Sequence, residues 1–158
     1  MNAQFIKKIH LALLMAAPAF LSAQLQVLEV VPAKTVTVKA GATSEAPLSL
    51  KVTPGYHVNS NTPSDAYLIP LRLTWSSGAV ETAEIVFPMP RNEKYSFSEK
   101  PLSVFTGDFE IVTRLKAAAS ASPGSVILNG KLHYQACNDH ECLAPRTINI
   151  TLPVEIVK

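Results

Sequence analysis

An alternation of apolar and polar residues with a period of two runs through most of this chain, and it restricts the fold to one made of β-strands. In residues 46–53, for example, Leu48, Leu50 and Val52 fall on one face of an extended segment. No segment carries a sustained 3.6-residue period with caps, although residues 116–122 have the composition of a short helical turn. We expect strands at residues 24–31, 35–39, 46–53, 68–75, 83–87, 109–117, 125–135 and 147–157.

Most of the 12 prolines lie at the boundaries of these segments, as expected for residues that end strands and form turns. This many short strands in one domain predicts an all-β fold, an immunoglobulin-like β-sandwich, with a closed barrel as the alternative. Trp75 shares the period of Leu71 and Leu73, so it is expected in the core. Residues 88–105 form one long irregular region, and a loop of that length favours a functional role.

The N-terminus has the order of regions found in secretory signal peptides. Lys7 and Lys8 precede an apolar run over residues 11–21, and small residues follow, with a cleavage site expected after Ala23. A membrane anchor is the alternative, but the run is shorter than the ~20 residues that span a bilayer. The sequence therefore predicts residues 1–23 as a cleaved leader and residues 24–158 as one exported domain.

The charge of the mature chain limits its partners. Removing Lys7 and Lys8 from the 14 basic residues leaves 12, equal to the 12 acidic residues. A neutral chain without a basic cluster argues against nucleic-acid binding. No second apolar stretch is long enough to span a membrane, and no exposed apolar stripe argues against a monomer. We expect a soluble, monomeric domain.

Two cysteines, Cys137 and Cys142, are separated by four residues, with strand-like sequence on both sides. They are expected at the tip of a hairpin, and an exported chain favours a disulfide between them. A structural disulfide closing so short a loop stabilises a fold by only about 2 kcal/mol in the chain-entropy account. An exposed disulfide of this kind is instead accessible to another thiol, which favours thiol–disulfide exchange. From the residues alone, both interpretations stay open.

A metal site is the third interpretation of the cysteine pair. Cys137, Cys142, His140 and His133 carry thiolate and imidazole ligands, but the spacing is not the usual two-residue knuckle. His140 can alternatively stabilise the thiolate of Cys142, or it can be a solvated loop residue. For Ser103, no base and acid partner can be placed that would make a hydrolytic triad.

Two segments carry a resemblance to a known family. Residues 134–145, YQACNDHECLAP, resemble the active-site hairpin of the N-terminal periplasmic domain of DsbD-type thiol:disulfide interchange proteins. Residues 54–63, PGYHVNSNTP, followed by YLIP at 67–70, resemble a second segment of that family, and the order of the segments agrees over the whole mature chain. The chain is therefore identified as similar to this family.

The resemblance implies an immunoglobulin-like periplasmic domain that takes electrons from a membrane-embedded electron carrier and passes them to thioredoxin-like proteins. By this resemblance Cys142 forms the intermolecular disulfide and Cys137 resolves it. The implied activity is thiol:disulfide interchange of the disulfide-reductase type. No cofactor is expected, because the two sulfur atoms carry the electrons.

The family also shields its cysteines with a loop that bears an aromatic residue. The region of residues 95–105 corresponds to that loop, with Phe97 as the first candidate for the shield and Tyr95 as the second. Tyr56, His57 and Asn59 are expected to line the site by resemblance. The alternative for these polar residues, favoured for Asn59, is that they only satisfy backbone groups in a turn.

Two departures from the family matter. Its well-known members have five residues between the cysteines, so the hairpin tip must differ here. Full-length members also contain a transmembrane electron carrier and a thioredoxin-like domain, which are not found in a sequence that ends at Lys158. We expect separate proteins to supply those functions, or another redox partner. The alternative function is a non-catalytic immunoglobulin-like binding module whose disulfide is structural.

Overall fold

The computed structural model describes residues 26–158, which form twelve β-strands and no helix. The signal peptide predicted at residues 1–23 lies outside the described residues. The strands are β1 Leu28–Val30, β2 Val36–Lys39, β3 Thr43–Val52, β4 His57–Asn59, β5 Arg72–Trp75, β6 Val80–Val86, β7 Arg91–Glu93, β8 Leu102–Phe105, β9 Asp108–Ala117, β10 Gly124–Tyr134, β11 Ala136–Cys137 and β12 Arg146–Val157.

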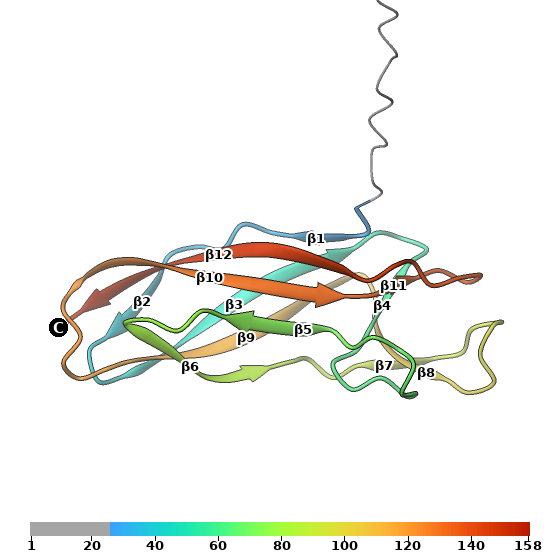
Figure 1. Ribbon diagram of the computed structural model, residues 1–158, viewed down its shortest axis with the longest axis horizontal. Coiled ribbons are helices and arrows are strands. Elements are labelled where there is room, and N and C mark those ends of the chain that lie inside the picture. Colours follow the sequence, from blue (N-terminus) through green and yellow to red (C-terminus); the bar gives the residue numbers. More distant parts are fainter. Residues whose placement is uncertain (1–25) are drawn as a thin grey trace, which may run out of the picture.

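Two four-stranded sheets make the two layers of an elongated sandwich (Figure 1). One has the order β1-β3-β9-β6 and the other the order β2-β12-β10-β5. All pairs in them are antiparallel except β12 with β2, which is parallel. The predicted all-β, immunoglobulin-like sandwich is confirmed.

The core between these sheets follows from the alternation in the sequence. In the four longest strands, every second side chain is directed between the layers, where burial of apolar surface stabilises the fold. The contributing apolar residues are Ala46, Leu48, Leu50 and Val52 of β3, Ile111 and Leu115 of β9, Leu128 and Leu132 of β10, and Ile150, Leu152, Val154 and Ile156 of β12.

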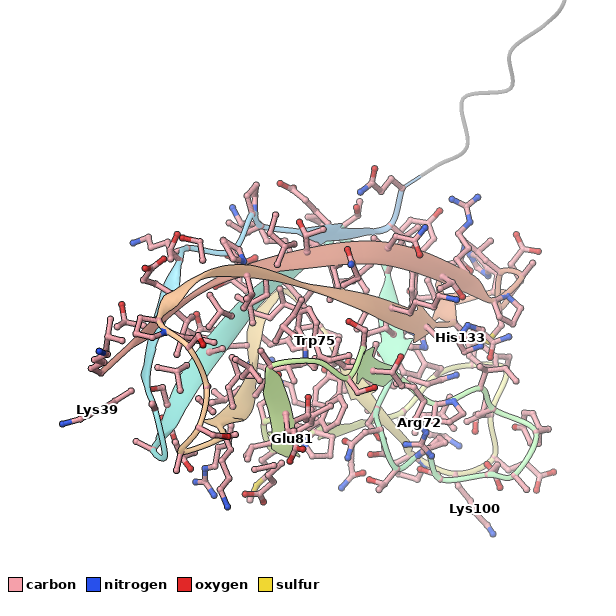
Figure 2. The ribbon with its side chains drawn as sticks, turned by 60° about the vertical axis from the view of Figure 1, so that its left-hand side comes forward. Lys39, Arg72, Trp75, Glu81, Lys100 and His133 are labelled. Carbon is pink, nitrogen blue, oxygen red and sulfur yellow. A yellow bond between two sulfur atoms is a disulfide. The ribbon has the colours of Figure 1, made fainter. Side chains whose placement is uncertain are left out.

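Trp75 packs against both main hydrophobic clusters, as its register predicts (Figure 2). The indole N–H of Trp75 also has a hydrogen-bond partner. Its Nε1 donates to Thr113 Oγ1 at 2.9 Å, so the buried hydroxyl and the indole satisfy each other. Gly130 is the cross-strand partner of Trp75. A Cβ at Gly130 would lie 2.6 Å from Trp75 Cε3, so only glycine leaves room for the ring.

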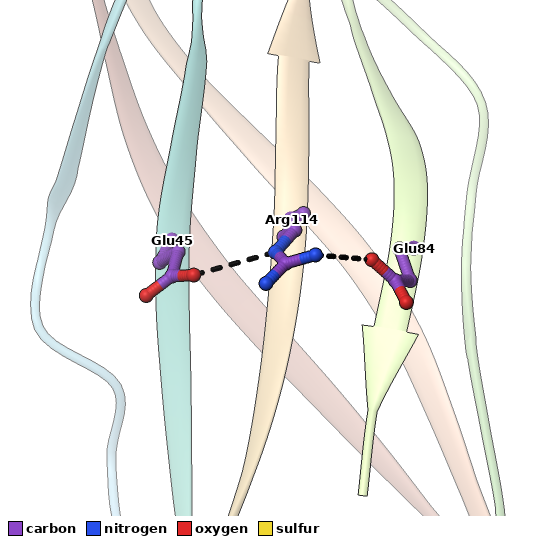
Figure 3. Close-up of polar contacts among 3 residues, drawn as sticks. All are labelled: Glu45, Glu84 and Arg114. Atoms are coloured by element: carbon purple, nitrogen blue, oxygen red, sulfur yellow. Dashed lines mark hydrogen bonds and ion pairs between the residues drawn. The ribbon is translucent and has the colours of Figure 1, made fainter.

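An ion-pair group lies on the outer face of the first sheet (Figure 3). Arg114 of β9 contacts Glu45 of β3 through Nε at 3.3 Å and Glu84 of β6 through Nη1 at 2.5 Å. The two carboxylates raise the pKa of Arg114. All three side chains are about half exposed, so solvent screens the attraction.

A third sheet, which we call the site sheet, has the order β11-β4-β8-β7 and lies at one end of the sandwich (Figure 1). Its strands are short, and the sequence pattern did not predict them. The prediction of one irregular region over residues 88–105 was wrong, because this region contains β7 and β8. All four residues of β8 are buried, so they give a continuous run instead of an alternation.

Two other expectations differ from the structure. Residues 68–71 precede β5 instead of belonging to it, although Leu68 and Leu71 are buried. Residues 116–122 contain no helical turn, since β9 continues to Ala117 and a turn follows in which Ala121 N–H donates to Ala118 O. Within residues 26–158, no helix exists that could cross a membrane.

Candidate functional site

The two cysteines form a disulfide at the end of the site sheet, as the sequence predicted. Cys137 ends β11, and Cys142 pairs with it as an isolated antiparallel bridge, with the two Cα atoms 3.9 Å apart. Cys137 is completely buried, whereas Cys142 is exposed. The disulfide therefore presents one of its two residues to solvent.

The turn between the cysteines is held by its first residue. Asn138 N–H donates to Glu141 O at 2.9 Å, and Asn138 Oδ1 accepts from the backbone N–H groups of His140 and Glu141. Asparagine is favoured at such a position because its side chain replaces a backbone acceptor. His140 itself is exposed on this turn. The hairpin tip is thus fixed by local bonds.

A tight turn places His57 next to the cysteine pair. Pro54 and Gly55 are the central residues of a turn closed by Tyr56 N–H donating to Thr53 O, and the φ of Gly55 is 83°. Strand β4 begins directly afterwards, and its His57 is the antiparallel partner of Cys137. Directly opposed residues project to the same face, so the imidazole lies beside the buried cysteine.

His57 is buried in an environment that disfavours its charged form. It is 1% exposed, and its Nε2 has no hydrogen-bond partner among the described residues. Burial lowers the pKa of the imidazole below 6.5, while the negative charges of Glu93 and Asp139 act in the opposite direction. Because burial is the largest of these effects, the ring is neutral at neutral pH.

Aromatic rings of the loop between β7 and β8, residues 94–101, cover His57. We call this segment the cap loop. The ring of Tyr95 stacks on His57 with centroids 4.0 Å apart, and the ring of Phe97 lies 5.7 Å from Tyr95 and 6.5 Å from His57. Ser96 Oγ donates to Asp139 O at 2.8 Å, which ties the cap loop to the cysteine turn. The cap loop therefore contacts both His57 and the turn between the cysteines.

Tyr95 is anchored by a carboxylate. Its hydroxyl donates to Glu93 Oε2 at 2.7 Å. Burial and this bond raise the pKa of Tyr95 well above its usual range, so the phenol stays protonated. Tyr95 is buried, whereas Phe97 is 39% exposed. Tyr95 is thus the inner ring of the cap loop, and Phe97 is the outer ring.

Asn59 and Gln135 join the strands behind the cysteines. Asn59 Nδ2 donates to Ile69 O at 3.0 Å and to Gln135 Oε1 at 3.1 Å. Gln135 Nε2 in turn donates to Leu143 O, one residue beyond Cys142. The two amides therefore fix β4, the segment before β5 and the chain that follows Cys142 relative to one another.

A pocket of about 370 Å³ opens beside His57 and Tyr95. Tyr56, His57 and Tyr95 line it together with the acidic residues Glu93 and Asp139. Within residues 26–158, no group of three or more His, Cys, Asp or Glu side chains is arranged to hold a metal ion. The arrangement can carry out the chemistry of a dithiol with an adjacent imidazole.

The structure brings most of the predicted residues together. His57, Tyr95 and Phe97 lie next to the cysteine hairpin, Tyr56 lines the pocket, and Asn59 supports the site from behind. His140 lies on the turn. His133 lies outside the site sheet, on β10, where its Nδ1 bonds to Thr147 Oγ1 of the neighbouring strand β12. Sequence reasoning missed three residues that hold the site, Glu93, Ser96 and Gln135. Their closeness in sequence to the aromatic pair and to Cys137 was the one available signal.

The profile of the family described as thiol:disulfide interchange protein DsbD, N-terminal, matches residues 24–153, which is most of the chain. The chain belongs to this family. Membership supports a periplasmic thiol–disulfide exchange domain, in agreement with the resemblance of the cysteine hairpin. A comparison with curated proteins gave no match.

Among solved structures, this DsbD N-terminal-type domain is similar to the N-terminal periplasmic domain of ScsB from Proteus mirabilis. The identity is 13% and the TM-score 0.54, over 79% of this chain and 44% of the solved chain. The likeness therefore shows the fold, and this chain spans less than half the length of that solved chain. A cohesin–dockerin complex from Clostridium thermocellum matches at 13% identity over 84% of this chain and 100% of the other, with a TM-score of 0.46 that supports no further comparison.

Proposed function

We propose that this domain carries electrons by dithiol exchange, with Cys142 as the residue that forms the intermolecular disulfide and Cys137 as the resolving thiol. The observation that carries the proposal is the unequal burial of the pair. An incoming thiolate can reach Cys142, which is exposed, and cannot reach Cys137, which is fully buried. Thiol–disulfide exchange depends on which sulfur is accessible.

The reaction balances without a cofactor. In the reduced domain the Cys142 thiolate attacks one sulfur of a partner disulfide, forming a mixed disulfide and releasing the other partner sulfur as a thiolate. The Cys137 thiolate then attacks Cys142 Sγ. The Cys137–Cys142 bond forms, the bond to the partner breaks, and the partner leaves as a dithiol. The domain is oxidised by two electrons, and the partner is reduced by two.

A purely structural disulfide explains the geometry less well. The bridge spans a sequence separation of only 5 residues, so closing its loop stabilises the fold by about 2 kcal/mol at most. Asn138 already holds the same turn through two side-chain bonds. A cross-link is therefore not required to define the hairpin.

The proposed partners follow from the family. A thioredoxin-like protein receives the electrons, and a membrane-embedded carrier restores the dithiol, both on the periplasmic side. The cap loop limits exchange with other thiols, with Phe97 as the outer shield. We further propose that the mature domain is a monomer formed by residues 24–158 after removal of the leader.

Trapping with single-cysteine variants tests this proposal. The oxidised form of a periplasmic thioredoxin-like protein is mixed with reduced Cys137→Ser or Cys142→Ser, and disulfide-linked products are separated on a non-reducing gel. Cys137→Ser should accumulate the mixed disulfide because its remaining Cys142 has no resolving partner. Cys142→Ser should accumulate almost none. Equal trapping by both variants, or normal electron transfer by Cys142→Ser, would overturn the assignment.

A further inference from the structure

His57 stands in a position that its packing alone does not explain. It is the cross-strand partner of Cys137, and both residues are buried on the same side of the site sheet. Tyr95 covers a face of the imidazole with its ring 4.0 Å away, which leaves the ring nitrogens at the edge. Nε2 is buried and has no hydrogen-bond partner among residues 26–158.

A buried ring nitrogen without a hydrogen-bond partner costs free energy, so its presence in a folded domain calls for an explanation, such as a bond that forms in another redox state. In the oxidised domain the sulfur of Cys137 is part of the disulfide and has no proton to donate. In the reduced domain it carries a thiol, and that thiol must lose its proton before it can attack. A neutral imidazole beside it is an acceptor of the right kind.

The groups around His57 suit this role. Glu93 of β7 and Asp139 of the cysteine turn place negative charge near the ring, which stabilises the imidazolium once it forms. Tyr95 of the cap loop stays protonated and bonded to Glu93, so it does not compete for the proton. His57 also lines the pocket beside the site, which gives a proton a path to solvent.

We propose that His57 is the proton acceptor for the Cys137 thiol in the resolving step. The inference rests on the proposed exchange function. As Cys137 Sγ attacks Cys142 Sγ in the mixed disulfide, its proton passes to the imidazole of His57. The electron pair of the broken Cys142–partner bond leaves on the partner sulfur, which then takes a proton from His57 or from water. The imidazole ends neutral, and no other reactant is consumed.

A stopped-flow experiment separates this step from the first one. The reduced domain is mixed with a symmetric aromatic disulfide whose thiolate is coloured. Cys142 releases one coloured thiolate in a phase that depends on reagent concentration, and Cys137 releases the second in a phase that does not. The concentration-independent phase therefore reports Cys137 alone. Both phases are measured from pH 5 to pH 9 for the wild type, for His57→Phe and for the control His133→Phe.

In the wild type the second phase should already be on a plateau at pH 7, because the neutral His57 is available to accept the proton. In His57→Phe, which keeps the stack on Tyr95, it should be about 30-fold slower at pH 7, because a thiol with the ordinary pKa of about 8.5 is only a few per cent ionised. Its rate should rise about tenfold per pH unit up to about pH 8 and then level off as the thiol ionises. His133→Phe, on β10, should keep the wild-type profile (Figure 2).

An identical pH profile for His57→Phe and the wild type would overturn the inference and leave His57 as a packing residue. If His57→Phe does not fold, His57→Asn replaces it. If neither folds, the wild type decides: the inflection of its second phase must coincide with the titration of His57 followed by NMR, and a mismatch overturns the inference. Failure of the exchange function itself would show differently, as a missing first phase or as trapping that does not depend on Cys142.

Discussion

The sandwich core and the site sheet are built on opposite principles. Between the two large sheets almost every buried side chain is apolar, and the exception, Thr113, is bonded to Trp75. Of the six buried polar residues among residues 26–158, the other five lie in the site sheet or in loops joined to it: His57, Asn59, Ser60, Ser98 and Ser103. One region is packed for stability, and the other holds polar groups at a reactive disulfide.

The stability of the domain should therefore depend mainly on the sandwich core, and the reactivity of its disulfide mainly on the site sheet. Removing apolar atoms from the sandwich leaves a cavity, whereas changing the site sheet alters bonds and charges near the cysteines. Core variants should therefore change the free energy of unfolding with little effect on exchange. Site variants should change the reactivity of the disulfide more than their effect on stability suggests.

The largest effect on stability is expected in the core. Leu115→Ala removes a completely buried side chain of β9 and should lower the free energy of unfolding by about 2–5 kcal/mol. Urea unfolding measures the loss, with Ile127→Ala as the control because Ile127 is 65% exposed. The rate at which dithiothreitol reduces the disulfide in the folded protein should stay unchanged. A large change in that rate would mean that the sandwich core and the site sheet are not independent.

Replacing Asn59 tests whether a buried residue of the site sheet affects the disulfide as well as the stability of the fold. Asn59→Ala removes the donor to Ile69 O and to Gln135 Oε1, and should lower the free energy of unfolding by about 1–3 kcal/mol. It should also change the reduction rate of the disulfide, since Gln135 holds the residue after Cys142. Asn61→Ala is the control, because its carbonyl bond to Arg72 is kept. A stability loss with an unchanged reduction rate would place Asn59 with the core.

The pH dependence of stability should also distinguish the site sheet, which contains His57, from the sandwich core. The pKa of His57 is lower in the folded oxidised domain than its ordinary 6.5, so below pH 6.5 the unfolded chain binds more protons than the folded one. Stability should therefore fall as the pH drops from 6.5 towards the folded pKa, and be fully present above 6.5. Urea unfolding at several pH values should show a weaker decline for His57→Phe. An unchanged decline would assign it to carboxylates elsewhere.

Phe97 should affect access and hardly affect stability. Because its ring is 39% exposed and stacks outside Tyr95, Phe97→Ala should change the free energy of unfolding by less than about 0.5 kcal/mol. Reduction of the disulfide by dithiothreitol should become a few times faster as the shield is removed. Tyr67→Ala, at a side chain that is 70% exposed, is the matched control. Equal rates for Phe97→Ala and the wild type would remove Phe97 from the shielding role.

The smallest effect is expected at Arg114. Arg114→Met removes two ion pairs that are about half exposed, so the melting temperature should shift by no more than about 3 °C. High salt should abolish the difference from the wild type, since it screens exposed charges. Exchange should be unaffected. A larger, salt-independent loss would mean that the arginine contributes through packing instead.

The sequence predicted the core far better than the site sheet, for a physical reason. The long strands β3, β9, β10 and β12 bury one face, so the alternation that marks Leu48 or Leu152 is visible in the chain. Strands β4 and β8 are buried on both faces and β7 is polar, so none of them alternates. The pairing of His57 with Cys137 depends on tertiary structure. Its place at the site was expected only through the family resemblance.

The reduction potential of the Cys137–Cys142 couple decides whether this disulfide exchanges with partner proteins or only holds the fold. The mature domain is equilibrated with glutathione buffers of known ratio, and the free thiols are counted after acid quenching. A couple that exchanges with thioredoxin-like proteins should have a potential between about −180 and −270 mV. A value below about −300 mV would identify a structural disulfide and contradict the proposed exchange function.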